Sequence, residues 1–335
     1  LFTDVRSRIA AEFERVQKTA KAVARLDVLT SFALVARQKN YCRPEISDDG
    51  KIEIKEGRHP VVETVIKTPF VSNDTHFDMG KNRCAVITGP NMAGKSTYMR
   101  QVALITIMAQ IGSFVPASYA KIGIVDAVFT RVGASDDLFS GQSTFMVEMN
   151  EVAGILKNAT KHSLLILDEI GRGTSTFDGM SIAQAVLEYI VSKKLGAKVM
   201  FATHYHELTC LAGTLEGVNN FNIAVKKRGD DITFLRRIVP GGADRSYGIE
   251  VAALAGVPKT VVKRAKEILS ELESGEHGSM SEHSAAPADD GMQLSLMSSF
   301  ENPVIEKLKA VDLDTLTPIE AMNKLYELKK EADKM

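Results

Sequence analysis

The sequence predicts an α/β fold in which a parallel sheet carries a phosphate-binding loop, and three observations predict it. Residues 88–97 read Thr-Gly-Pro-Asn-Met-Ala-Gly-Lys-Ser-Thr, which contains the pattern G-x-x-x-x-G-K-S. A short apolar run at 84–87 precedes this loop, and an apolar helix predicted over 96–111 follows it. Further along, four apolar residues end in two carboxylates at 164–169, as in a Walker B strand. Strand, glycine loop and buried helix, in this order, are the setting that a P-loop requires.

Length and composition limit the possible classes of protein. The chain has 335 residues, enough for one large α/β domain with appendages, and its net charge of −1 gives no basic character for binding nucleic acid by itself. Cys42, Cys84 and Cys210 are far apart, which favours neither a disulfide framework nor a zinc site and fits a reducing cytosol. We find no membrane-length apolar run and no signal-peptide pattern, so we expect a cytoplasmic protein with no membrane partner.

The N-terminal 40 residues predict a long helix. Residues 1–40 contain neither Gly nor Pro, and their apolar residues recur at helical spacing. Because Leu1 starts in the middle of this pattern without an initiator Met, we expect a C-terminal piece of a longer protein, with 1–40 ending a helical domain. Pro44 breaks the helix and 51–54 alternates like a strand, so the nucleotide-binding domain is predicted over 41–247.

The loop predicts how a nucleoside triphosphate is held. Backbone N–H groups of the loop and the positive N-terminus of the following helix converge on the phosphates. Lys95 is expected to reach the β- and γ-phosphates, and the Ser96 hydroxyl to bind Mg²⁺. The residues expected to contact the nucleotide here are Gly89, Pro90, Asn91, Met92, Ala93, Gly94, Lys95, Ser96 and Thr97.

Two residues upstream are candidates for the nucleotide base. Phe70 and Val71 lie in a segment ahead of the P-loop strand. The Phe70 ring suits stacking on adenine, but the residue could equally be part of the core. Both remain candidates from the sequence alone.

The Walker B run predicts the metal and the catalytic base. Asp168 would hold Mg²⁺, while Glu169 could polarise a water for attack on the γ-phosphate. Two carboxylates at a strand end are often only a turn, although their distance downstream of a P-loop favours catalysis. Between the two motifs, 124–129 is predicted to be a strand, and a helix is predicted over about 179–194.

Two further residues carry open alternatives. Ser143 is a good N-cap for the helix that follows it, and it could also aim a hydroxyl and a helix N-terminus at an anion. His204 follows a buried strand at 198–203; such a histidine is usually structural, but at a strand tip it can sense the γ-phosphate.

The C-terminal part predicts helices and a linker. After a strand at 232–239, residues 247–273 predict a helix-turn-helix. A packing or dimer element is favoured over a DNA-reading one, because the second helical segment carries acidic residues as well as basic ones. Residues 274–299 are rich in small and polar residues and predict a disordered linker, in which Gln293–Met297 forms an apolar island suited to docking. A capping box at 317–320 starts a last helix, which needs a partner such as a copy of itself.

Together these segments resemble the C-terminal part of the bacterial MutS family of DNA mismatch-recognition ATPases. The motifs that carry the resemblance are residues 88–97, Ser143–Met149 (Ser-Thr-Phe-Met-Val-Glu-Met), Leu167–Thr176 (Leu-Asp-Glu-Ile-Gly-Arg-Gly-Thr-Ser-Thr), Ala202–Tyr205 (Ala-Thr-His-Tyr) and Ser246–Ile249 (Ser-Tyr-Gly-Ile). The resemblance implies a P-loop NTPase of the ABC-ATPase type that binds ATP or ADP with Mg²⁺. It also implies a homodimer in which the Ser143 loop of one subunit completes the phosphate site of the other.

The same resemblance assigns the remaining segments and partners. It implies the end of a helical core or lever domain at 1–40, a dimer element at 248–273, a linker at 274–302 and an oligomerisation tail at 303–335. The island at 293–297 is similar to peptides that bind the replication sliding clamp. Mismatched DNA and a MutL-type protein are the other partners implied for the whole protein, whose mismatch-reading domain would lie upstream of Leu1.

Two positions depart from the family pattern. Arg236 stands where the family usually has a His close to adenine, and Ala93 replaces a frequent glycine of the loop. A guanidinium can also stack on a base, and the outer glycines of the loop are retained.

These observations support three hypotheses for function. The first is an Mg²⁺-dependent ATPase that switches a DNA-repair clamp. The second is a nucleotide-gated dimerisation and partner-tethering module with little turnover of its own. The third, a small-molecule kinase, is weak because such an enzyme has no use for a glutamate poised to activate water.

Overall fold

The computed structural model describes residues 1–90, 93–132, 143–228, 231–242 and 247–274. The chain divides into two compact units, 1–257 and 258–335, and each is considered by itself. The predicted linker, the candidate clamp-binding peptide and the predicted tail helix lie outside the described residues, as do Asn91 and Met92 of the loop. Within the described part, no helix is both long enough and apolar enough to cross a membrane.

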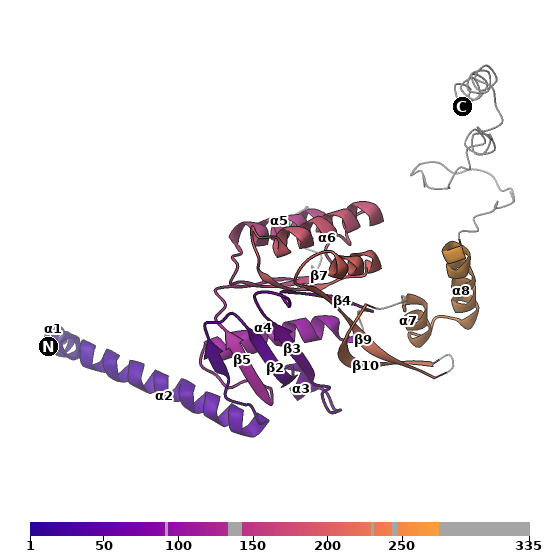
Figure 1. Cartoon of the computed structure of the whole chain (residues 1–335). Helices are drawn as coiled ribbons and strands as arrows, with labels where there is room; N and C mark the ends of the chain where they lie inside the picture. Colours follow the sequence, from indigo (N-terminus) through magenta and orange to yellow (C-terminus); the bar gives the residue numbers. More distant parts are fainter. Residues whose placement is uncertain (91–92, 133–142, 229–230, 243–246, 275–335) are drawn as a thin grey trace, which may run out of the picture. The chain divides into compact units, whose positions relative to one another are not determined.

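The first unit alternates strands and helices around two sheets (Figure 1). Its helices are α1 (Phe2–Ala11), α2 (Phe13–Lys39), α3 (Val62–Val65), α4 (Lys95–Gln110), α5 (Thr144–Asn158), α6 (Thr176–Val191), the 3₁₀-helix η2 (His206–Gly213) and α7 (Gly248–Leu254). Its strands are β1 (Glu45–Ser47), β2 (Ile52–Gly57), β3 (Asn73–Phe77), β4 (Cys84–Thr88), β5 (Tyr119–Gly123), β6 (Val128–Arg131), β7 (Leu164–Asp168), β8 (Lys198–Ala202), β9 (Val218–Arg228) and β10 (Asp231–Pro240).

The larger sheet confirms the parallel core predicted from the sequence. Its described strands have the order β10-β9-β4-β8-β7-β6, in which only the β9–β10 hairpin is antiparallel. Strands β4, β7 and β8 are buried along their whole length, which explains why their central residues form apolar runs rather than an alternating pattern. Because these three strands are parallel neighbours, the residues at their carboxyl ends meet at one edge of the sheet.

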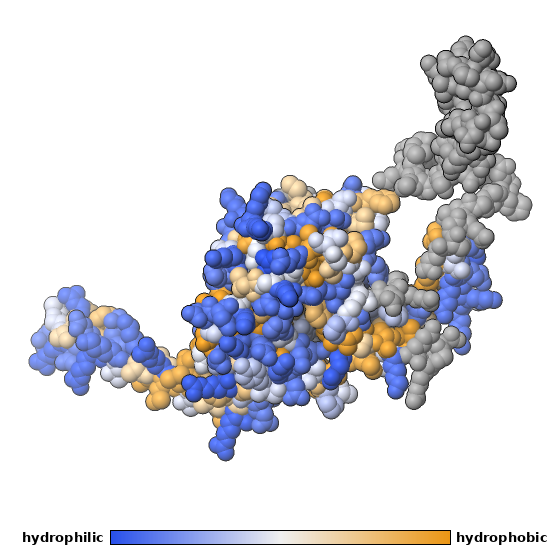
Figure 2. Space-filling model, viewed as in Figure 1, coloured by the Kyte–Doolittle hydropathy of each residue, from blue (hydrophilic) through white to orange (hydrophobic). Residues whose placement is uncertain are grey.

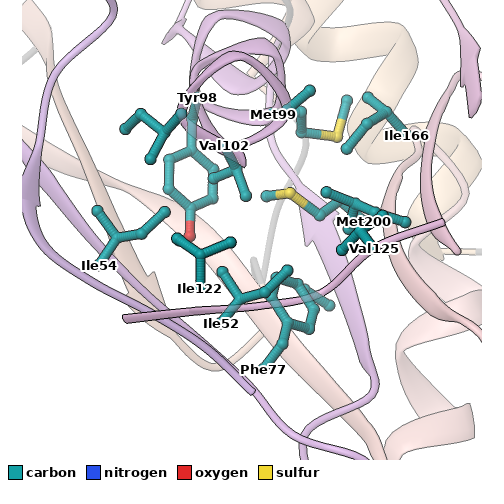
Figure 3. Close-up of a cluster of buried hydrophobic side chains, with 14 of the residues drawn as sticks. Ile52, Ile54, Phe77, Tyr98, Met99, Val102, Ile122, Val125, Ile166 and Met200 are labelled. Carbon is teal, nitrogen blue, oxygen red and sulfur yellow. The ribbon is translucent and has the colours of Figure 1, made fainter. Parts of the chain in front are cut away.

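The smaller sheet has the described order β1-β5-β2-β3 and supports helix α4 from the other side. Ile52, Ile54 and Phe77 from this sheet pack against Tyr98, Met99 and Val102 of α4, with Ile166 and Met200 of the larger sheet on the far side (Figure 3). A second apolar cluster on the opposite face of the larger sheet joins it to α5, α6 and η2. The loop before α4 is therefore held by a helix that is packed between two sheets.

One predicted strand is wrong. The apolar run 124–129 does not form a single strand, because β5 ends at Gly123 and β6 begins at Val128. The backbone of Val125 pairs instead with the side chain of Gln110, through bonds of 2.6 Å to its N–H and 2.9 Å to its carbonyl oxygen. This segment carries the chain from the smaller sheet to the larger one.

The predicted N-terminal helix is present but is interrupted once, at Glu12, between α1 and α2. It ends at Asn40, which adopts a left-handed conformation with φ of 54°. Many of its apolar residues are exposed, including Phe13, Val16 and Leu26, and Figure 2 shows hydrophobic residues at the surface along α2. Exposed apolar residues of this kind are typical of a helix face that packs against another element.

Two helices near the end of the described chain agree with the predicted segments on either side of residues 256–258. Helix α7 belongs to the first unit, and α8 (Lys259–Ser274) belongs to the second. Apolar side chains of α8 such as Val261, Ile268 and Leu272 are exposed. Whether these helices form a dimer element stays a prediction.

Candidate functional site

The predicted phosphate-binding loop connects β4 to α4. Gly89 follows the strand with φ of 122°, and Gly94 precedes the helix with φ of 106°. Both values lie in the region that only glycine adopts without strain, so the outer glycines fix the path of the loop. Ala93 is completely buried, so the loop accommodates its methyl group. Pro90 and Thr97 are half-buried.

Lys95 is the first residue of α4 and is completely buried. Its ammonium group donates to the carbonyl oxygen of Gly89. Burial lowers the pKa of Lys95, and the nearby carboxylates of Glu169 and Asp168 partly oppose that shift. A buried cation of this kind gains strongly from an anion placed in the loop.

The next residue joins the loop to the Walker B strand. The Ser96 hydroxyl donates a 2.5 Å hydrogen bond to Oδ2 of Asp168, at the end of β7. The other oxygen, Oδ1, is buried and has no hydrogen-bond partner among the described residues. Burial raises the pKa of Asp168, and the Ser96 bond partly opposes this. A hydroxyl beside an unsatisfied carboxylate oxygen fits the oxygen ligands that Mg²⁺ prefers.

Glu169 and His204 come together at the same sheet edge. Asp168 pairs with Ala202 in the β7–β8 register, and the N–H of Glu169 donates to the carbonyl of Ala202 at 2.9 Å. Oε1 of Glu169 lies 2.5 Å from Nε2 of His204, and its other oxygen lies 2.5 Å from Nη1 of Arg172. Glu169 has φ of 57°, an uncommon conformation for a residue with a side chain and one that is enriched at functional sites.

A cavity of about 220 Å³ adjoins the start of α4. Phe70, Val71 and Arg236 line it together with Gly94 and Thr97 of the loop region. Phe70 is half-buried and lines this cavity, so it is not enclosed in the core. The structure thus brings both residues proposed for the base, and the arginine that departs from the family pattern, to one hollow beside the phosphate loop.

Sequence reasoning missed two residues of this cavity. Asn73 donates to the carbonyl of Arg236 at 3.0 Å and accepts from the N–H of Ile238 at 2.7 Å, which holds an irregularity in β10. Gln101 is completely buried, and neither its amide oxygen nor its amide nitrogen has a hydrogen-bond partner in the described part of the chain. Only the structure reveals the hydrogen bonds between Asn73 and β10, because the two are far apart in the sequence.

Ser143 is exposed and begins α5. Its hydroxyl accepts a 3.2 Å hydrogen bond from the N–H of Met146, which is the capping role. The sequence left two roles open for this residue, and the cap is the one seen within this chain. A role at the phosphate site of a second subunit stays a prediction.

The fold and this arrangement define the chain as an α/β protein of the P-loop nucleotide-binding class. Its sequence matches the family described as MutS domain V over residues 85–273, and the DNA mismatch repair protein MutS C-terminal region over 299–331. The chain belongs to the MutS family of DNA mismatch repair proteins.

Similar proteins come from several microorganisms. The chain is 58% identical to the DNA mismatch repair protein MutS of Ruminiclostridium cellulolyticum, with 98% of this chain and 39% of that protein covered. The protein of the same name from Acetivibrio thermocellus is 57% identical with the same coverage. That of Methanococcoides burtonii is 54% identical, with 100% of this chain and 39% of the other covered. The chain therefore spans about two fifths of the length of the relatives it matches.

Proposed function

We propose that this chain is the Mg²⁺-dependent ATPase region of a DNA mismatch repair protein. ATP binding and hydrolysis here would control the dimer and the clamp state of the whole protein. The observation that carries this proposal is the convergence of Lys95, the Ser96–Asp168 pair and the Glu169–His204 pair at the carboxyl end of three adjacent parallel strands.

Each residue has a distinct role in the proposed reaction. Lys95 binds the β- and γ-phosphate oxygens, and the loop N–H groups hold them in place. Ser96 and Asp168 would hold Mg²⁺, which supplies charge neutralisation at the phosphate oxygens when it is bound. Glu169 orients a water molecule and accepts its proton, and His204 holds the carboxylate and senses the γ-phosphate.

The nucleotide base would occupy the cavity beside α4. Phe70 offers an aromatic face, Arg236 a guanidinium and Val71 its backbone to the base. ATP and ADP would both fit this description, because they share the base and differ only at the end of the phosphate chain.

The site is proposed to be completed by a second copy of the chain, in an ATPase of the ABC type. Ser143 is exposed at a helix N-terminus, where it can approach a phosphate of the partner subunit. In the whole protein, mismatched DNA, a MutL-type protein and the sliding clamp are the proposed partners, with Gln293–Met297 as the candidate clamp peptide. The helices near 248–273 and the tail at 303–335 would serve dimerisation and self-association.

Hydrolysis measured against protein concentration tests this proposal. Specific activity should rise with concentration if two copies share the site, and Glu169→Ala should slow hydrolysis by about 10²–10⁴-fold while ATP still binds. An unchanged rate in Glu169→Ala would remove this residue from the role of base. Calorimetry that detects no binding of ATP or ADP to the wild-type chain would overturn the proposal as a whole.

One observation favours a second function, that of a nucleotide-gated assembly module with little turnover. Both carboxylate oxygens of Glu169 are engaged, one by His204 and the other by Arg172, which is a resting arrangement for a base. Sedimentation with and without ATP, measured beside phosphate release, separates the two functions. ATP-driven dimerisation with negligible phosphate release would favour the assembly module.

A further inference from the structure

A buried carboxylate on α5 makes a contact that the proposed reaction has not used. Glu148 is only 4% exposed, and its Oε1 accepts a 2.6 Å hydrogen bond from the N–H of Gly171. Gly171 is two residues beyond Glu169 and directly precedes Arg172. Glu148 therefore connects the helix that Ser143 begins to the turn that follows the Walker B strand.

The same glycine is held from its other side. The hydroxyl of Tyr205 donates a 3.0 Å hydrogen bond to the carbonyl oxygen of Gly171, and Tyr205 is the residue after His204. Gly171 has φ of 87°, and it lies so close to Gly179 that a side chain at position 171 would clash with the backbone of Gly179. Both polar groups of one residue are thus fixed by side chains from two other segments.

The second oxygen of Glu148 faces a cation. Nη2 of Arg131 lies 3.7 Å from Oε2 of Glu148, and both side chains are 6% exposed. Arg131 also pairs with Glu151, one turn further along α5, at 2.9 Å. An unpaired buried carboxylate is costly, and the arginine supplies a positive partner beside this one.

Close packing supports the same connection. A Cβ atom added at Gly173 would lie 3.1 Å from Cβ of Phe145, which is in the first turn of α5. The first turns of α5 are therefore seated on the 171–173 segment. Because packed elements transmit strain, a shift of this segment would be expected to reach Ser143, and a shift of α5 to reach Glu169.

We propose that Glu148 is a positioning residue that holds Gly171, and with it Glu169 and Arg172, in register with the helix begun by Ser143. This inference rests on the proposed function, in which Glu169 serves the site of its own subunit and Ser143 that of the partner. Within each subunit, Glu148 then connects Glu169, at that subunit's own nucleotide site, to Ser143, which serves the nucleotide site of the partner. Glu148 itself contacts neither nucleotide nor water.

The test compares variants in the whole chain. Glu148→Leu removes the acceptor for Gly171, whereas Glu148→Gln can keep it, and Tyr205→Phe removes only the hydroxyl on the other side of the same glycine. The matched control is Glu151→Gln, which alters the same helix and the same arginine without touching Gly171. The measurements are kcat, the Kd of ATP, the melting temperature and hydrogen exchange of the peptide 169–175.

We expect Glu148→Leu to lower kcat by about 10–100-fold, because a small displacement of a catalytic group is enough for such a loss. The Kd of ATP should stay within about twofold, since Lys95 and the loop are untouched. Exchange in 169–175 should become faster, and Glu148→Gln should recover most of the activity. Tyr205→Phe should act in the same direction, and its effect should be non-additive with that of Glu148→Leu.

Three results would overturn the inference and leave the proposed function standing. One is a folded Glu148→Leu chain with wild-type kcat and exchange; another is an effect no larger than that of Glu151→Gln. If Glu148→Leu does not fold, Tyr205→Phe serves as the test instead. The third result is a Tyr205→Phe chain with wild-type kcat and wild-type exchange. A wild-type chain that hydrolyses no ATP would overturn the proposed function and this inference together, so the two failures are distinguishable.

Discussion

The Ser96 hydroxyl and the Asp168 carboxylate are joined by a 2.5 Å hydrogen bond, although 72 positions separate them in the sequence. This bond connects the start of α4 to the end of β7. The two expected Mg²⁺ ligands are therefore adjacent in the folded chain itself. A preformed pair of this kind loses less freedom when the metal and the nucleotide bind.

The first prediction concerns this pair. Ser96→Ala removes one expected metal ligand. It also removes the hydroxyl that donates to Oδ2 of Asp168. We expect the Kd of ATP in Mg²⁺ to rise by about 10–100-fold, with little change in EDTA. Calorimetry in both buffers measures this. Ser113→Ala is the matched control, because Ser113 is buried and its hydroxyl donates to the carbonyl of Phe114, outside the proposed metal site. An equal loss in both buffers would contradict the metal role.

The second prediction concerns the base cavity. Phe70→Ala removes the aromatic face and should weaken ATP binding by about 1–3 kcal/mol, roughly 5–150-fold in Kd. Phe70→Tyr should bind nearly as well as the wild type, because the ring is retained. Phe114→Ala serves as the control, since Phe114 is a partly exposed ring that does not line this cavity. Unchanged affinity in Phe70→Ala would place the base elsewhere.

Local patterns allowed the sequence to predict the phosphate loop, α4 and the buried strands β7 and β8. These elements are specified by residues that are close in the chain: outer glycines, a continuous apolar run and two terminal carboxylates. The incorrectly predicted strand at 124–129 shows the limit of local patterns. The backbone of Val125 is hydrogen-bonded to the side chain of Gln110, and no pattern within this segment indicates that pairing.

Long-range pairing was the main feature that the sequence could not reveal. Strand β9 was not predicted, although it lies beside β4 in the sheet. The link from Glu148 to Gly171 and the hold of Asn73 on β10 also depend on segments brought together only by the fold. Residue types alone cannot identify these partners, because a buried carboxylate or amide looks like any other polar residue in the sequence.

The third prediction concerns a buried lysine away from the site. Lys198 is completely buried, and its ammonium group donates to the sulfur of Met79 at 3.6 Å. Burial lowers the pKa of Lys198 below its usual 10.5, and Asp126 only partly opposes this. Between the lowered pKa and 10.5, the unfolded chain binds more protons than the folded one, so wild-type stability should rise with pH across that window.

Lys198→Met should therefore stabilise the chain most below the lowered pKa. The gain should raise the melting temperature by about 2–4 °C per kcal/mol and disappear as the pH approaches 10.5. Thermal unfolding from pH 7 to 10.5 measures the difference. Lys18→Met, at an exposed position on α2, is the control for replacing a lysine by methionine. A gain that stays constant over this range would contradict the buried-charge explanation.

The last prediction tests whether Ser143 acts on the partner subunit. Ser143→Ala and Lys95→Ala should each be nearly inactive alone. If Ser143 acts in trans, a mixed dimer has one intact site, formed by the Lys95 of one chain and the Ser143 of the other. Random pairing makes half of the dimers mixed, so an equal mixture should regain about a quarter of wild-type hydrolysis.

The matched mixture combines Lys95→Ala with Glu169→Ala. Lys95 and Glu169 belong to the same site of the same chain, since parallel neighbours β4, β8 and β7 bring them to one sheet edge. No intact site can arise from this pair, and the mixture should remain inactive. Recovery in the first mixture alone places Ser143 across the subunit boundary. If neither mixture recovers although co-purification through two different tags shows mixed dimers, the hydroxyl does not act across the subunit boundary.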